Sequence, residues 1–88
     1  MDVLQVEKIL KALANRRRLK ILQLLKERRR VSVTEIAGHI KLSFKSTSRH
    51  LSVLRNADLV EGEQVGLSVL YSFTPSIPKI VDQILSSI

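Results

Sequence analysis

Four polar side chains recur at helical spacing in the middle of the chain: Lys45, Ser48, Arg49 and Ser52. Residues three or four positions apart share one face of an α-helix. Cations and short hydroxyl side chains together suit the major groove of DNA, where cations meet phosphates and short donors reach base edges. An ordinary surface helix with solvated charges would show the same pattern, so the other elements must decide between the two.

A helix beginning just after Ser43 would position this polar face. The Ser43 hydroxyl can accept from the free backbone N–H groups of a first turn, which makes it a suitable N-cap. Thr47, Leu51 and Leu54 recur at i, i+4 and i+7 on another side. This narrow stripe predicts a helix that packs on a core with one face and presents the polar face outward.

The preceding residues complete a helix-turn-helix. Ser32 and Glu35 have the spacing of a capping box, which predicts a short helix over about residues 33–40. Residues 41–43 then form a three-residue turn into the polar helix. Lys41 would occupy the left-handed position that Gly often takes in such a turn, at a cost of about 1 kcal/mol.

The rest of the chain predicts three more helices and a β-hairpin. The expected helix starts are Asp2, Asn15 and Thr74-Pro75, and the second helix runs to about Glu27. Between residues 59 and 73 the apolar period changes to two around a Gly-containing turn, which predicts a two-stranded wing. The expected fold is therefore mainly α with a small β-hairpin: a winged helix-turn-helix with about five helices.

The first and last helices carry more apolar surface than one contact normally uses. In the last helix, apolar residues from Ile77 to Ile88 recur at i, i+3, i+4, i+7, i+8 and i+11. Such a stripe must be buried, because burying one aliphatic side chain is worth roughly 1.5–3 kcal/mol. We expect a homodimer joined through the first and last helices, although both helices could instead pack only on their own core. The expected interface residues are Leu4, Leu10, Ile77, Ile80, Val81, Ile84, Leu85 and Ile88.

Charge is distributed unevenly along the chain. The 88 residues, the size of a single domain spanning 1–88, carry a formal net charge of +7. Residues 1–57 hold 14 basic and 4 acidic groups, hence +10, and residues 58–88 hold 1 and 4, hence −3. This asymmetry indicates a polyanionic partner, although solubility alone can also account for a basic chain.

Several classes of function lack the residues that they need. The absence of Cys excludes disulfides and thiolate metal sites. Paired carboxylates, a nucleophile with a nearby base and a glycine-rich phosphate loop are also missing, so we expect no enzyme, no catalytic residue and no cofactor. His39 and His50 stand alone and are expected to be structural. Without a long apolar run or an export leader, we expect a soluble cytoplasmic protein with no membrane partner.

Together these stretches resemble the ArsR/SmtB type of winged helix-turn-helix transcriptional repressor. The resemblance covers nearly the whole chain, is most specific at residues 48–55, and rests on residues 13–22, 33–37, 42–51, 53–55 and 57–60. It implies a homodimer that places two recognition helices in successive major grooves of a near-palindromic operator in double-stranded DNA. It also implies repression by blocking the promoter. The alternative is a winged-helix module for protein–protein interaction, without sequence-specific DNA binding.

The expected DNA contacts fall into two groups. Direct contacts come from the first turn and polar face of the recognition helix, with an aromatic ring against a thymine methyl group: Phe44, Lys45, Ser46, Ser48, Arg49 and Ser52. Backbone contacts, which hold register without reading sequence, come from cations: Arg16, Arg17, Lys41 and Arg55. Ser43 can donate its hydroxyl to a phosphate or simply cap the helix.

The chain departs from this family at the metal sites and at the wing. Metal-sensing members carry Cys where this chain has Ser32 and Thr34, and the last helix has Asp82 but no His, so no metal is expected. The wing tip, usually basic, consists of Leu67 and Ser68 with two Glu residues nearby. We therefore expect the helices to carry most of the attraction to phosphate.

Overall fold

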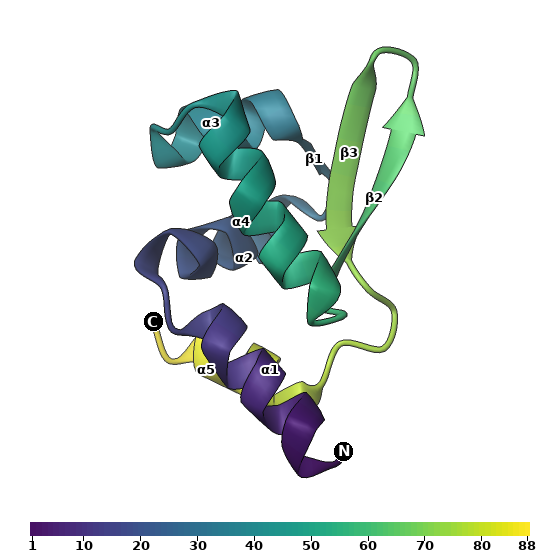
Figure 1. The fold of residues 1–88 in the computed structure, drawn as a ribbon. Helices are drawn as coiled ribbons and strands as arrows, with labels where there is room; N and C mark the ends of the chain where they lie inside the picture. The colour runs from purple at the N-terminus through teal and green to yellow at the C-terminus, as the bar shows by residue number, and fades with distance from the viewer.

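The computed structural model describes all 88 residues, Met1 to Ile88, as five helices and three short strands (Figure 1). Along the chain these are α1 (Val3–Leu13), α2 (Arg16–Arg28), β1 (Val31–Ser32), α3 (Val33–Ile40), α4 (Phe44–Asn56), β2 (Val60–Val65), β3 (Ser68–Phe73) and α5 (Lys79–Ser86). The winged helix-turn-helix is confirmed: α3 and α4 form the helix-turn-helix, and β2 with β3 form the hairpin. The α1 and α5 helices occupy the end of the molecule away from α3 and the wing tip (Figure 1). None of the helices is both long and apolar enough to cross a bilayer.

Side-chain caps determine where the first three helices begin, as the sequence predicts. Asp2 and Ser32 each form a complete capping box and accept from the backbone N–H three residues later, at 2.8 and 3.1 Å. Asn15 accepts from two backbone N–H groups of α2, at 3.0 and 3.1 Å. Each cap satisfies donors that a helix N-terminus leaves without intrahelical partners.

The last helix begins later than the sequence predicts. Its first residue is Lys79 and Pro78 is the N-cap residue, so residues 74–78 form a connecting loop that includes Ile77. The prediction that Thr74-Pro75 starts this helix is therefore wrong. The physical reason lies in Pro78, because a proline disfavours helical backbone at the residue before it.

The sheet of the wing has three strands rather than the two expected. The β3 strand pairs antiparallel with β2 from Val60 opposite Phe73 to Val65 opposite Ser68, and its other edge pairs with β1. Only two residues form β1, so the segment is too short to show an apolar period of two. This short strand joins the start of α3 to the middle of β3 in the wing.

The buried face of α4 is the one that the sequence predicts. Thr47, Leu51 and Leu54 are each 0% exposed. The two leucines belong to one buried cluster that draws side chains from all five helices and all three strands. Because interiors are close-packed, this anchoring fixes which face of α4 points outward.

Thr47 is the one polar residue buried in this core, and its hydroxyl has no hydrogen-bond partner. Valine has the same shape without the oxygen, so we expect Thr47→Val to raise the free energy of unfolding by about 1 kcal/mol. Urea unfolding followed by circular dichroism measures this change. The control Thr47→Ser keeps the hydroxyl, removes a methyl group and should lower stability. A Thr47→Val protein no more stable than the wild type would show that the hydroxyl is satisfied in solution.

Candidate nucleic-acid interface

The turn between α3 and α4 determines how the recognition helix leaves the core. Lys41 ends α3 in the left-handed conformation, with φ 58° and ψ 48°, as the sequence predicts. Its backbone N–H and that of Leu42 both donate to the carbonyl of Ala37. Ser43 then caps α4 by accepting from the N–H of Ser46 at 3.1 Å. Capping uses the oxygen of Ser43 as an acceptor and leaves its hydroxyl proton available to donate.

The outer face of α4 combines unpaired cations with partly sheltered hydroxyl groups. Lys45 and Arg49 are exposed, and neither forms an ion pair within the protein. Ser48 and Ser52 are half-buried beside them, as is Ser46 in the first turn. A cation that is paired with an internal carboxylate must give up that pair before it neutralises a phosphate, whereas an unpaired cation has no such cost. The face therefore keeps its full charge for an external anion.

The first residue of α4 is also accessible. Phe44 is 60% exposed, although an aromatic ring of this size gains free energy from burial. Its position at the N-terminus of α4 puts an apolar group beside the cationic face. Such a group can contact a thymine methyl in the major groove.

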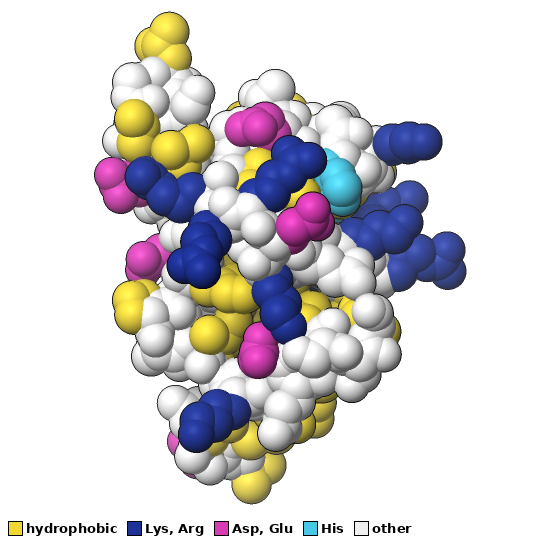
Figure 2. Space-filling model, turned by 180° about the vertical axis from the view of Figure 1, so that it is seen from behind, with side chains coloured by type: hydrophobic (Ala, Val, Ile, Leu, Met, Phe, Trp, Pro, Cys, Tyr) yellow, Lys and Arg dark blue, Asp and Glu magenta, His cyan; other side chains and the backbone are white.

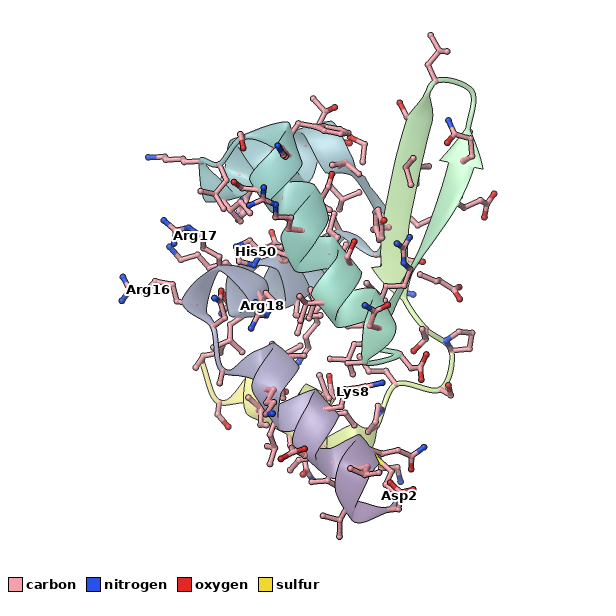
Figure 3. The ribbon with its side chains drawn as sticks, in the orientation of Figure 1. Asp2, Lys8, Arg16, Arg17, Arg18 and His50 are labelled. Carbon is pink, nitrogen blue, oxygen red and sulfur yellow. The ribbon has the colours of Figure 1, made fainter.

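The flanking cations predicted to contact the DNA backbone differ in their surroundings. Arg16 and Arg17 are exposed at the N-terminus of α2 and point away from the body of the protein (Figure 3). Lys41 is exposed at the end of α3. Arg55, in contrast, donates from Nη1 to the Tyr71 hydroxyl at 3.4 Å, which links the end of α4 to β3. Three of these four cations thus have no side-chain partner in the protein.

Acidic side chains accompany the cations on one face but not along its edge. On the face turned away from the viewer in Figure 1, Lys and Arg side chains are mixed with Asp and Glu (Figure 2). At the right edge of that view a group of Lys and Arg side chains has no acidic neighbour (Figure 2). The views differ by 180°, so this is the side on which Arg16 and Arg17 project in Figure 3. Cations without acidic neighbours therefore lie on the side of the molecule from which Arg16 and Arg17 project.

The wing contributes little positive charge. Between residues 60 and 73 there is no Lys or Arg, and Leu67 at the tip is fully exposed. Glu63 pairs with Arg30 at 3.7 Å, an exposed contact worth less than about 1 kcal/mol. Attraction to a polyanion must therefore come from the helices.

Arg18, which the sequence pattern does not single out, turns inward. Its Nε donates to the carbonyl of Ala12 at 2.6 Å and its Nη2 donates to the carbonyl of Lys11 at 3.1 Å, both at the end of α1. Its Nη1 lies 3.3 Å from Nδ1 of His50 on α4. A guanidinium group can only donate, so Nδ1 of His50 is the acceptor and the imidazole is neutral in this contact. Three consecutive arginines in the sequence carry no sign that the third differs from the others.

Burial lowers the pKa of His50 below its ordinary value of 6.5, and the charges of Arg18 and Arg17 lower the pKa further. The folded protein therefore binds fewer protons at His50 than the unfolded chain does. The contribution of neutral His50 to the free energy of unfolding is fully present above pH 6.5. It is lost as the pH falls from 6.5 through the lowered pKa. We expect the free energy of unfolding to decrease on acidification from about pH 7.5 to about pH 5.5. The decrease should be smaller in His50→Gln, which does not titrate. Equal pH dependence of both proteins in urea unfolding would contradict this assignment.

The residues at the family's metal positions do not fit a soft metal ion. The Ser32 hydroxyl accepts from the Glu35 N–H and lies 3.1 Å from the Glu35 carboxylate, so the capping box already uses it. Hydroxyl groups are also poor ligands for ions that prefer thiolate. Asp82 pairs with Lys26 at 3.2 Å, and the chain contains no group of three or more His, Cys, Asp or Glu that could hold a metal.

The residues expected at the dimer interface divide into an exposed and a buried set. The exposed set is Leu4, Leu10, Ile80 and Ile88. The set that packs on the chain's own core is Ile77, Val81, Ile84 and Leu85. On α1, Val3, Val6 and Leu10 line an open groove of about 570 Å³, which we call the α1 apolar face. Exposed apolar surface is thus concentrated on α1 more than on α5.

The fold and the cationic outer face of α4 define a winged helix-turn-helix protein of the DNA-binding class. The model of a family of bacterial regulatory proteins, the arsR family, matches residues 15–62, from the cap of α2 into β2. The chain belongs to the arsR family and is a DNA-binding transcriptional regulator.

Three relatives show how far the similarity extends. The transcriptional activator HlyU of Vibrio cholerae is 35% identical over 77 residues, which cover 88% of this chain and 70% of HlyU. A solved structure of HlyU matches with a TM-score of 0.86 at 29% identity and covers 99% of this chain and 97% of that chain. The solved structure of a homodimeric winged helix-turn-helix DNA-binding domain from Mycobacterium bovis matches with a TM-score of 0.80 at 31% identity. The match covers 94% of this chain and 73% of that chain. The solved structure of the transcriptional repressor PagR of Bacillus anthracis matches with a TM-score of 0.76 at 28% identity. The match covers 93% of this chain and 94% of that chain.

Proposed function

We propose that the chain is one DNA-binding domain that acts as a homodimeric repressor, with its two α4 helices in successive major grooves of a near-palindromic operator. The observation that carries the proposal is the outer face of α4, where Lys45 and Arg49 are exposed and unpaired on a helix whose other face is fully buried. An α-helix fits the major groove, and cations with hydroxyl groups can contact both phosphates and base edges there.

Cations outside α4 support a DNA partner. Arg16 and Arg17 lie in the first turn of α2, where the positive end of the helix dipole disfavours cations. Phosphate groups beside these arginines would offset the unfavourable interaction with the helix dipole. Binding of the arginines to the phosphates would also release counterions from the duplex. We propose that these two residues and Lys41 contact the DNA backbone, while Arg49 and the neighbouring hydroxyl groups of α4 contact bases.

The α1 apolar face supports the homodimer. Val3 and Leu10 of this face are 84% and 54% exposed, and Leu4 on the same helix is 75% exposed. Apolar side chains are visible at this end of the molecule (Figure 2). In a two-fold dimer each of these positions contributes one side chain from each copy. Complete burial of one such side chain is worth roughly 1.5–3 kcal/mol. The related Mycobacterium bovis domain is homodimeric. We propose that α1 provides most of the interface and that Ile80 and Ile88 extend it.

Repression by occupancy is the mode of regulation that this arrangement makes simplest. A dimer that lies over two successive grooves covers promoter DNA and excludes other proteins from it. Among the relatives, PagR is named a repressor and HlyU an activator. We propose repression without a metal or a cofactor.

Selection of bound sites from random duplexes tests the proposal. Selected sequences should contain two inverted half-sites about 10 base pairs apart, one turn of the double helix. The logarithm of the affinity should then fall linearly with the logarithm of salt concentration, by about 0.9 for each phosphate neutralised. An affinity for duplex DNA that does not change with salt concentration would contradict the proposal, as would no binding in dilute buffer. Either result would leave the alternative of a module for protein–protein interaction.

A further inference from the structure

Arg18 contacts three helices from one side chain. It belongs to α2, donates through Nε and Nη2 to the last carbonyls of α1 at 2.6 and 3.1 Å, and reaches His50 of α4 through Nη1 at 3.3 Å. Figure 3 shows it on the inner side of α2, with Arg16 and Arg17 directed outward from the same turn. The three consecutive arginines therefore have two different surroundings.

The chemistry of these contacts makes the junction rigid. The carbonyl groups of Lys11 and Ala12 belong to the last turn of α1, where a helix leaves acceptors unsatisfied and where a cation is favoured. The guanidinium group is planar and holds its donors in a fixed fork, so one side chain sets the relative direction of its acceptors. His50 is half-buried, which limits competition from water for its Nδ1.

We propose that Arg18 is a positioning residue for operator recognition, which acts through His50 to hold α4 at a fixed place relative to α1. The inference rests on the proposed function, because it assigns α1 to the dimer interface and α4 to the major groove. In such a dimer, the junction between α1 and α4 sets where each recognition helix lies relative to the two-fold axis. Arg18 thus contributes to operator recognition without touching DNA.

A positioning role for Arg18 should affect the affinity for the operator and the affinity for unrelated duplex differently. Attraction to phosphates is long-ranged and tolerates small displacements of a helix. Hydrogen bonds to base edges require an accurate position, because their strength falls steeply with distance and angle. Loss of the Arg18 contacts should therefore reduce binding to the operator more than binding to unrelated duplex.

The experiment measures the ratio of affinities for the selected operator and for a scrambled duplex of the same length. We expect Arg18→Ala to reduce this ratio by about tenfold, the loss that one misplaced base contact would cause. The neighbouring variant Arg17→Ala is the matched control, because it removes the same charge from an outward position. It should weaken binding to both duplexes alike and make the salt slope shallower by about one.

His50 supplies the second half of the test. His50→Ala should reduce the ratio as Arg18→Ala does, and the double variant should lose little more, because the two residues act through one contact. His50→Gln retains a side-chain oxygen that can accept from Arg18 and should restore most of the ratio. A purely structural role would lower the melting temperature and leave the ratio of the folded protein unchanged. If Arg18→Ala does not fold, His50→Ala and His50→Gln decide the question.

The outcomes separate this inference from the proposed function. A wild type that selects an operator, together with variants at Arg18 and His50 that keep the full ratio, overturns the positioning role alone. If Arg18→Ala weakens binding to both duplexes equally and makes the salt slope shallower, Arg18 contacts a phosphate. That result also overturns the positioning role. A wild type that selects no operator overturns both.

Discussion

Leu10→Asp is expected to convert the dimer to monomers and to abolish tight binding to the operator. Leu10 lies on the α1 apolar face, and a two-fold interface would lose two buried leucines and bury two carboxylates. Leu10 is 54% exposed in one protomer, so the interface can bury only about half of each leucine. The apolar loss from the two copies is then roughly 1.5–3 kcal/mol, or about tenfold to a hundredfold in the dimerisation constant. Sedimentation equilibrium measures the association state, and fluorescence anisotropy with labelled operator measures binding. Each half-site would then be bound singly and weakly.

Leu67→Asp is the matched control for this prediction. Leu67 is fully exposed at the wing tip, so the same chemical change there leaves α1 untouched. It should keep the dimer intact, and circular dichroism should show both variants folded, since neither leucine is buried in the core. A Leu10→Asp protein that sediments as a dimer would move the interface away from α1.

The order of the elements was predictable because its determinants are local. Asp2, Asn15 and Ser32 each accept from a backbone N–H two or three residues away, so the cap and its partner are adjacent in the sequence. The buried stripe of α4 follows from a helical period of 3.6 residues. Even the left-handed Lys41 could be predicted, because a three-residue turn between two helices leaves few other backbone paths.

Features that depend on distant parts of the chain could not be predicted. The apolar stripe of α5 indicated burial but not its partner, and the structure places Val81 and Leu85 in the chain's own core. The β1 strand exists only because Val31 meets Tyr71 across the chain. Sequence spacing shows which residues share a face, whereas the identity of the covering element is a tertiary property.

The candidate site divides in the same way. Lys45 and Arg49 could be chosen from helical spacing, and the structure leaves both exposed. Arg18 could not be distinguished from Arg16 and Arg17, because its partners are backbone carbonyls of α1 and a histidine 32 residues away. Its inward direction follows from where α1 ends relative to α4, and a pattern of consecutive charges carries no information on that.

Arg49→Ala is expected to weaken binding to the operator by about 1–3 kcal/mol, or roughly tenfold to a hundredfold, while the protein remains a folded dimer. Arg49 is exposed on the outer face of α4, has no ion-pair partner and is not part of the buried core, so its removal should cost contacts with DNA and little stability. Anisotropy titrations on operator and scrambled duplex measure the effect, with a larger loss on the operator if Arg49 contacts a base.

The control for Arg49→Ala removes one positive charge elsewhere. Arg29 lies near Ser72, Phe73 and Asp82, and its φ of 71° suits glycine, so Arg29→Gly removes the cation without backbone strain. Any weakening in Arg29→Gly reflects net charge alone and should be small at physiological salt, where exposed charges are screened beyond about 8 Å. An equal loss on both duplexes in Arg49→Ala would make Arg49 a phosphate contact. If Arg49→Ala binds the operator no more weakly than Arg29→Gly does, the outer face of α4 is not the surface that reads DNA.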